Sequence, residues 1–150
     1  MKFNIDKCNV IHITNKRSNK IVYKYNLNGQ ILQETDTCTY LGINIQNDLK
    51  WNLHVANNIK KANSIIGLLR RNIGSCRADT KALAYQSLVR PVLEYATSAW
   101  DPHLKSHVNN IEMVQRRAAR FVNSDYRQTS SVSPMLSSLK WPTLQSRRTL

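Results

Sequence analysis

Pairs of basic residues recur through residues 51–150, and their side chains are of the type that binds phosphate. Lysine and arginine neutralise phosphate oxygens and hold a nucleic-acid backbone without reading its bases. The pairs are interleaved with apolar residues at helical spacing, which would place the cations on the surface of a folded scaffold. The candidate nucleic-acid-binding residues are Lys60, Lys61, Arg70, Arg71, Arg116, Arg117 and Arg120. A solvated basic face without a ligand is the plainer interpretation.

The charge of the whole chain favours a polyanionic partner. The 150 residues hold 22 Lys and Arg against 9 Asp and Glu, a formal net charge of +13. Residues 1–50 hold seven bases and four acids (+3), whereas residues 51–150 hold fifteen and five (+10). Such a field attracts nucleic acids. There is no glycine-rich phosphate loop, zinc-finger spacing or RNA-recognition aromatic signature, so we expect binding to the backbone and not to particular bases.

The other residue types that do chemistry are dispersed. No serine or cysteine motif surrounds any of the four histidines, as nucleophilic catalysis would require; these are His12, His54, His103 and His107. The nine acids do not cluster as two-metal phosphoryl transfer requires. Four of them stand where helix caps or turns are expected, namely Asp36, Asp48, Asp79 and Asp125. Glu112 precedes Arg116 by four residues, the favourable order for a helical ion pair. We therefore assign no catalytic residue.

The cysteines indicate neither a metal site nor a disulfide framework. Cys8, Cys38 and Cys76 are odd in number and lack paired spacing, which is typical of reduced intracellular thiols. Cys8 and His12 would share one face of a strand, but no second pair of ligands follows. We expect no metal and no cofactor.

The sequence predicts no membrane partner. No apolar run approaches the roughly 20 residues that cross a bilayer, and the first four residues begin no signal peptide. We expect a soluble, intracellular protein, whether nuclear or cytoplasmic.

The elements that must position the basic residues begin with a β part. Alternating apolar residues predict a strand over residues 8–14, and two further strands, residues 21–27 and 30–32, flank Asn28-Gly29, a hairpin signal. Another strand is predicted over residues 39–45, with Gly42 as a bulge or a close backbone approach. The sequence thus predicts a small antiparallel sheet over residues 1–46.

A helical period follows from Asp48 onward. A first helix capped by Asp48 or Asn52 and stopped by Gly74-Ser75 has its apolar stripe at Val55, Ile59, Ala62, Ile66, Leu69 and Ile73. A second helix, from about residue 79 toward 100, is expected to kink at Arg90-Pro91 and to place on one stripe Leu88, Val92, Ala96 and Trp100.

A third helix is predicted over residues 106–123. Its apolar stripe is Val108, Ile111, Val114, Ala118 and Phe121. Arg116 and Arg120 are expected to point away from this stripe, toward solvent or a ligand. A short helix over residues 135–139 follows a polar stretch, and another helix is predicted to start near the end of the sequence, which suggests truncation. The predicted fold class is α+β, with a β part at residues 1–46 and a bundle of three or four helices after it.

Several segments, in order, resemble non-LTR retrotransposon reverse transcriptases of the jockey-like kind, over nearly the whole chain. Met1-Lys2-Phe3-Asn4 with Lys7-Cys8 resembles the family's strand after the catalytic hairpin, and Tyr40-Leu41-Gly42-Ile43 with Leu49, Trp51 and His54 its junction between palm and thumb. Further segments resemble the family's downstream helical region. They are Leu88 to Ala96, Trp100-Asp101-Pro102, Ile111-Glu112 and Val114 to Phe121, followed by Asp125-Tyr126, Leu139, Trp141, Leu144 and Arg147-Arg148.

The resemblance implies the end of the palm over residues 1–46 and a thumb-like helical region over residues 47–150 that grips the primer–template backbone. The family's Tyr- or Phe-x-Asp-Asp motif, which would hold Mg²⁺ for RNA-directed DNA polymerase activity, does not occur in this sequence. The resemblance therefore implies a noncatalytic fragment. We also expect its β part, separated from the palm, to be marginally stable or to self-associate through uncovered apolar faces.

Two alternatives stay open from the sequence. The chain is a domesticated or stand-alone module that binds a protein partner through Trp100, Tyr95 and neighbouring apolar residues, with no role in nucleic-acid binding. Alternatively, the source gene encodes an active polymerase, and an in-frame Asp-Asp motif lies upstream of Met1.

Overall fold

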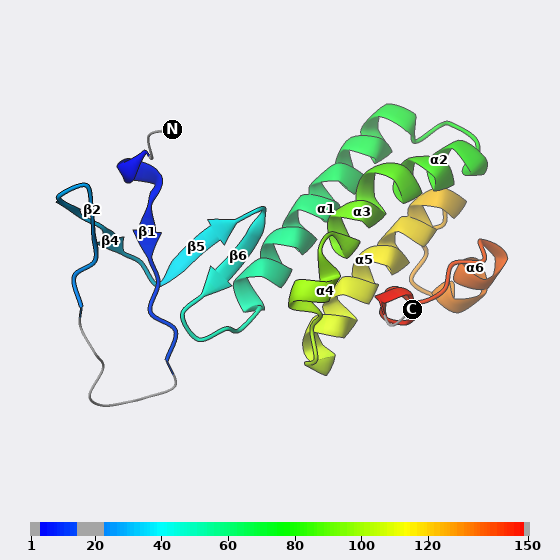
Figure 1. The fold of residues 1–150 in the computed structure, drawn as a ribbon. Helices are drawn as coiled ribbons and strands as arrows, with labels where there is room; N and C mark the ends of the chain where they lie inside the picture. Colours follow the sequence, from blue (N-terminus) through cyan, green and yellow to red (C-terminus); the bar gives the residue numbers. More distant parts are fainter. Residues whose placement is uncertain (1–3, 15–22, 149–150) are drawn as a thin grey trace. The chain divides into compact units, whose positions relative to one another are not determined.

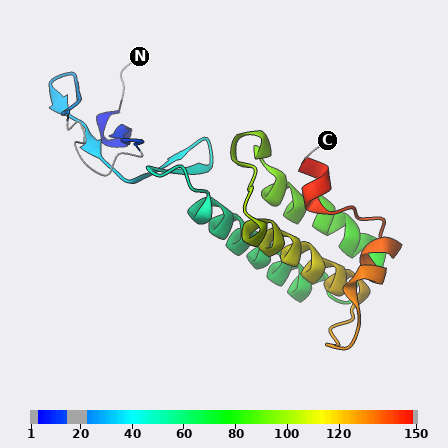
Figure 2. The ribbon, with the colours of Figure 1, turned by 90° about the horizontal axis from the view of Figure 1, so that it is seen from below.

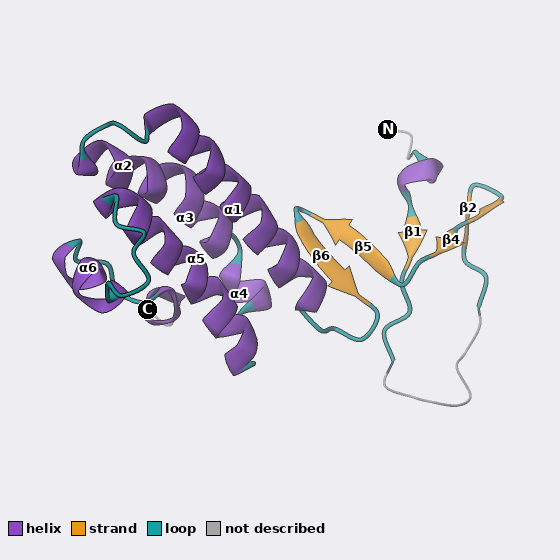
Figure 3. Cartoon of the chain, turned by 180° about the vertical axis from the view of Figure 1, so that it is seen from behind, coloured by secondary structure: helices purple, strands orange, loops and turns teal. Residues whose placement is uncertain are grey.

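The chain divides into two compact units, Met1–His54 and Val55–Leu150. The computed structural model describes residues 4–14 and 23–148. Short strands build the first unit and helices the second, as Figures 1 and 3 show. This is the α+β class that the sequence predicts, with the β part first. The division falls after His54, inside the first long helix, whereas the pattern of residues placed it after residue 46.

Among its described residues, the first unit contains three two-stranded ladders and one 3-10 turn. The hairpins β2–β3 and β5–β6 are antiparallel, whereas β1 and β4 pair in parallel. The parallel pair departs from the single antiparallel sheet that we expected. The bounds are η1 Ile5–Lys7, β1 Asn9–Val10, β2 Asn26–Leu27, β3 Gln30–Ile31, β4 Gln33–Glu34, β5 Thr37–Tyr40 and β6 Ile43–Gln46.

One predicted hairpin is confirmed, and a second was missed. Asn28 and Gly29 form the turn between β2 and β3, with φ of 52° and 82°. The single strand expected over residues 39–45 is wrong, because the chain reverses at Leu41-Gly42, where φ is 47° and 80°. A leucine rarely adopts positive φ, so its type gave no turn signal. Gly42 is the second turn residue and not a bulge. Ile21 and Val22, at the start of another expected strand, lie outside the described residues.

Helix α1 (Asn52–Ile73) begins where β6 supplies hydrogen-bond partners. The side-chain oxygen of Gln46 accepts a hydrogen bond from the backbone N–H of Leu53 (3.2 Å), which satisfies one of the donors that a helix N-terminus leaves unpaired. Asp48, expected as a cap, instead accepts from the N–H of Lys50 (2.9 Å) in a local turn. Further along, Val55, Ala62 and Leu69 of the predicted stripe are buried.

The second unit contains α1 from Val55 onward and a series of shorter helices. They are α2 (Ala78–Ala84), the π-helical turn η2 (Tyr85–Val89), α3 (Arg90–Glu94), α4 (Thr97–Trp100), α5 (Lys105–Asn123), α6 (Val132–Ser138) and α7 (Leu144–Arg148). Helices α1 and α5 run in the same direction (Figures 1 and 2). The segment α2 to α4, which connects them in the sequence, runs in the opposite direction. Among the described residues, no helix is both long and apolar enough to span a membrane.

The expected interruption of the second helix has the form of a π-helical turn followed by a break. Proline lacks the N–H of a regular turn and its ring clashes with the carbonyl four residues earlier, and Pro91 lies in the first turn after η2. The break follows at Ala96, where φ is 52°. The predicted stripe was wrong in part: Trp100 is buried as expected, but Leu88 is 52% exposed. Tyr85, Val89 and Leu93 are fully buried instead. The wider turn changes which residues face the core.

Helix α5 confirms the predicted third helix. Its apolar stripe is buried along its length, including Ile111, Val114 and Phe121. The helix ends at Ser124 (φ 53°), whose Oγ accepts a hydrogen bond from Lys81 Nζ (2.6 Å). Lys81 is buried, and its charge is favoured there because the carbonyl end of a helix is electrically negative.

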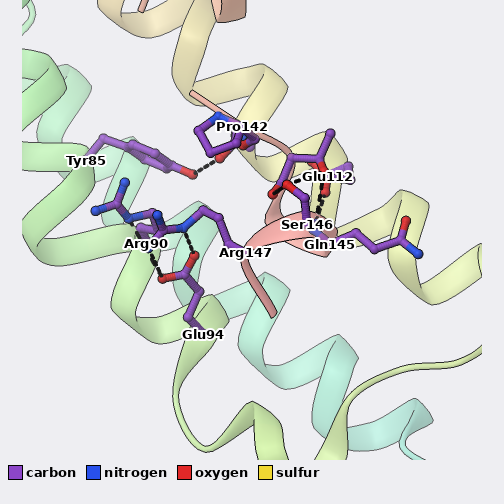
Figure 4. A network of polar contacts seen from close by, with 10 residues as sticks. Tyr85, Arg90, Glu94, Glu112, Pro142, Gln145, Ser146 and Arg147 are labelled. Atoms are coloured by element: carbon purple, nitrogen blue, oxygen red, sulfur yellow. Dashed lines mark hydrogen bonds and ion pairs between the residues drawn. The ribbon is translucent and has the colours of Figure 1, made fainter. Parts of the chain in front are cut away.

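The C-terminal segment is fastened to the bundle by polar contacts (Figure 4). The buried Gln115 accepts a hydrogen bond from Tyr85 Oη (3.0 Å) and donates one to the carbonyl of Pro142 (2.9 Å). Glu112, expected to pair with Arg116, instead accepts from the N–H of Gln145 (2.9 Å) in the first turn of α7. In the same region the Glu94 carboxylate forms ion pairs with both Arg147 and Arg90. These contacts fix α7 in place.

Candidate nucleic-acid interface

One flank of α1 carries a row of polar and basic residues next to the buried stripe. At 3.6 residues per turn, Lys60, Asn63, Gly67, Arg70 and Arg71 fall within an arc of about 100°. Lys60, Arg70 and Arg71 are exposed. The 22 residues of α1 include no acidic residue. The row is therefore uniformly positive.

Arg117 of α5 joins this row. Its guanidinium donates a hydrogen bond to Asn63 Oδ1 (3.1 Å), which brings the two helices together at the surface. On α1, a Cβ added to Gly67 would lie 3.8 Å from Arg71 Nη1, so the Arg71 guanidinium extends back along the same flank. We call Lys60, Arg70, Arg71 and Arg117 the basic seam.

An aromatic residue stands at one end of the basic seam. The guanidinium carbon of Arg70 lies 4.3 Å from the centroid of the Tyr126 ring, within the range of a cation–π interaction. Tyr126 follows the C-terminal end of α5, and it is 46% exposed. No sequence pattern selects Tyr126 or Asn63 as a binding residue, because their roles depend on contacts between segments distant in the sequence.

The structure separates three of the seven predicted residues from the basic seam. Lys61 is exposed but lies about 100° around α1 from Lys60. Arg116 is exposed, and it lies about 100° around α5 from Arg117. Arg120 is the third, and its surroundings differ in kind. For Lys61 and Arg116, binding to nucleic acid stays a prediction.

The expectation that Arg120 points to solvent or a ligand was wrong. Its guanidinium donates hydrogen bonds to the carbonyls of Asp125 (3.4 Å), Arg127 (2.8 Å) and Ser130 (2.9 Å). The side chain is half-buried. Helical periodicity gives the direction of a side chain, but it does not show that the chain folds back over it. Arg120 thus holds the loop that follows α5.

The carboxylate nearest Tyr126 in the sequence is neutralised by a neighbour. Asp125 accepts hydrogen bonds from the Arg127 guanidinium through both of its oxygens (3.0 and 2.9 Å) and from the Arg127 N–H (3.1 Å). The Arg127 side chain, with a further contribution from Ser130, holds the pKa of Asp125 well below its usual range. This carboxylate therefore stays ionised and paired, so it adds little repulsion toward an approaching phosphate.

Of the other two acids expected at caps or turns, Asp36 lies in the bend between β4 and β5, whereas Asp79 is not a cap, because the N-cap of α2 is Arg77. Asp36 Oδ1 accepts a hydrogen bond from the Asn47 side chain (2.7 Å), and Asp79 forms an exposed ion pair with Arg77. Across residues 4–14 and 23–148, no three His, Cys, Asp or Glu side chains are grouped to hold a metal ion. The three cysteines are free thiols.

The two aromatic residues of the alternative protein-binding hypothesis differ in exposure, and only Trp100 lies differently from what the hypothesis requires. Trp100 is 1% exposed, and its indole N–H donates to the carbonyl of Tyr95 (2.7 Å). Trp100 is thus a core residue and cannot contact a partner. Tyr95 is 56% exposed.

Comparison with known proteins adds no relative to these observations. No protein-family model, curated protein or solved structure matches the chain.

Proposed function

We propose that this chain corresponds to the part of a non-LTR retrotransposon reverse transcriptase that follows the catalytic palm motif, and that it binds nucleic-acid backbones without catalysing DNA synthesis. The ordered motifs from Tyr40-Leu41-Gly42 to Arg147-Arg148 support the origin. The basic seam supports the binding, and it is the observation that carries this part of the proposal.

The dimensions of the basic seam suit a phosphate backbone. Lys60 and Arg71 are eleven residues apart on α1, roughly 16 Å at the rise of an α-helix. Successive phosphates of one strand in a duplex are about 3.4 Å apart along the axis, so the row spans several of them. Because phosphate contacts contain no sequence information, the binding is tolerant of sequence.

A salt titration tests the binding. We expect the affinity for a fluorescein-labelled primer–template duplex, followed by anisotropy, to fall steeply between about 50 and 200 mM salt. The double variant Lys60→Ala/Arg71→Ala removes two phosphate contacts, so the slope of log affinity against log salt should decrease by about 1.8. Lys24→Ala/Lys105→Ala, which removes the same charge at exposed lysines outside the basic seam, is the matched control.

Two results would contradict the proposal. Undetectable binding at low salt removes the nucleic-acid function altogether. An equal loss in both double variants would mean that net charge, and not the basic seam, produces the binding.

The noncatalytic part of the proposal rests on the missing Asp-Asp motif and has its own test. Sequencing the gene upstream of Met1 decides between a noncatalytic product and an enzyme. An in-frame Asp-Asp motif within about one domain's length, on the order of 150 residues, would contradict the noncatalytic proposal for the full gene product.

A further inference from the structure

Tyr126 is a partly exposed aromatic residue at the end of the basic seam. A phenol ring has two faces, and the Arg70 guanidinium covers one of them at 4.3 Å from the centroid. The side chain is nevertheless 46% exposed. Tyr126 thus keeps nearly half of its surface accessible beside a row of cations. The cation–π contact with Arg70 occupies only one of the two faces.

The backbone around Tyr126 is held on both sides. Arg120 donates to the carbonyls of Asp125 and Arg127, the residues before and after Tyr126, and also to that of Ser130. The ion pair between Asp125 and Arg127 closes the same turn. Tyr126 therefore sits on a loop already ordered in the absence of ligand, and binding to an ordered surface loses less conformational entropy.

Cations and an open aromatic ring together favour one kind of nucleic acid. Proteins that bind single strands combine a basic track for the phosphates with aromatic side chains on which bases stack, because unpaired bases expose their faces. Inside a duplex those faces are covered by neighbouring base pairs. A ring that holds a guanidinium on one face and a base on the other would form a three-layer stack of Arg70, Tyr126 and base.

We propose that the basic seam takes single-stranded nucleic acid, with one base stacked on the face of Tyr126 opposite Arg70. This inference rests on the proposed backbone binding and makes it more specific. Stacking needs only the π-face that every base has, so it agrees with binding that tolerates sequence.

Paired oligonucleotides separate stacking from charge. The probes are a fluorescein-labelled oligodeoxyadenylate about 12 nucleotides long and an abasic oligomer of the same length, which has the same phosphates and no bases. The natural chain should bind the adenylate about tenfold more tightly than the abasic oligomer, the effect of one stacked base. Tyr126→Leu should remove this preference, and Tyr126→Phe, which keeps the ring, should retain it.

Three further measurements complete the test. Lys60→Ala/Arg71→Ala should weaken binding of both oligomers by the same factor, because both carry the same charge. Tyr95→Leu, a change at another exposed tyrosine of the same unit, should leave the preference intact. Circular dichroism of each variant confirms that the helices persist.

The possible failures are distinguishable. If the natural chain binds both oligomers equally, or if Tyr126→Leu keeps the preference, backbone binding stands and the stacking proposal is overturned. If neither oligomer nor the primer–template duplex binds at low salt, the proposed function falls and the stacking proposal falls with it.

Discussion

Basic residues of α1 and α5 that look alike in the sequence have different surroundings. Arg117 donates to an asparagine on the neighbouring helix, Arg70 lies over an aromatic ring, and Arg120 holds a loop through three carbonyls. Composition alone predicts that their positive charge favours a polyanionic partner. Their individual roles could not be predicted in this way, because each depends on a group brought close by folding.

Arg120 should matter for stability, whereas Arg116 should not. We expect Arg120→Met to leave carbonyls of the loop after α5 unpaired and to lower the free energy of unfolding by about 1–3 kcal/mol, measured by urea denaturation. The control, Arg116→Met, changes an exposed residue of the same helix and should stay within about 0.5 kcal/mol of the natural chain. Equal losses would show that the hydrogen bonds of Arg120 contribute nothing.

His54 should make the stability depend on pH. The side chain is 1% exposed, and its Nδ1 accepts a hydrogen bond from the N–H of Asn44 (3.2 Å), which requires a neutral ring. Burial lowers the pKa of His54 below its ordinary value of 6.5. As pH falls below 6.5, the unfolded chain binds a proton before the folded one does, so stability present above that pH is lost as pH falls through the folded pKa.

Denaturation series at pH values between about 8 and 5 measure this loss. In His54→Gln the part of the pH dependence due to this residue should be absent. An NMR titration that places the pKa of His54 at or above 6.5 would refute the assignment.

The elements were predictable where local chemistry and tertiary packing agree. Asn28-Gly29 marks a hairpin because both residues accept positive φ, and the stripe of α5 from Val108 to Phe121 is uninterrupted. The turn at Leu41 was missed because a leucine gives no such signal. The apolar stripe before Trp100 was misplaced because the prediction assumed 3.6 residues per turn throughout. A π-helical turn is wider, so the residues after it face a different direction.

Ala96 tests the strain at the break between α3 and α4. Its φ of 52° is unfavourable for any residue with a Cβ. Ala96→Gly should therefore stabilise the chain by up to about 1 kcal/mol and raise Tm by about 3 °C. The same substitution inside α2, Ala82→Gly, should cost about 1 kcal/mol because glycine weakens a helix. Thermal unfolding followed by circular dichroism compares them, and the same sign for both would contradict the strain.

At the scale of the whole molecule, the fully buried apolar side chains among the described residues all lie in the helical unit, although Leu83 and Leu88 are exposed there too. The helical unit buries Tyr85, Trp100, Phe121 and Leu144 almost completely. In the strand unit, Ile31, Tyr40 and Leu41 are each more than 60% exposed, and its ladders have only two strands each. Two-stranded ladders are marginal by themselves and leave edges that pair with other chains.

Self-association should therefore depend on the first unit. We expect the full chain to associate with increasing concentration in sedimentation velocity, whereas residues 47–150 alone stay monomeric and keep their helical circular dichroism. If residues 47–150 associate to the same degree, the contacts lie in the helical unit instead.

The π-helical turn Tyr85–Val89 has a consequence for evolution. A π turn closes its hydrogen bonds over five residues, one more than an α-helical turn, so it accommodates one inserted residue. A relative with a regular helix here would be one residue shorter between Tyr85 and Val89. An alignment without that gap would match the buried Leu93 to a surface position. When homologues are compared, an insertion or deletion of one residue inside this helix is therefore the event to look for.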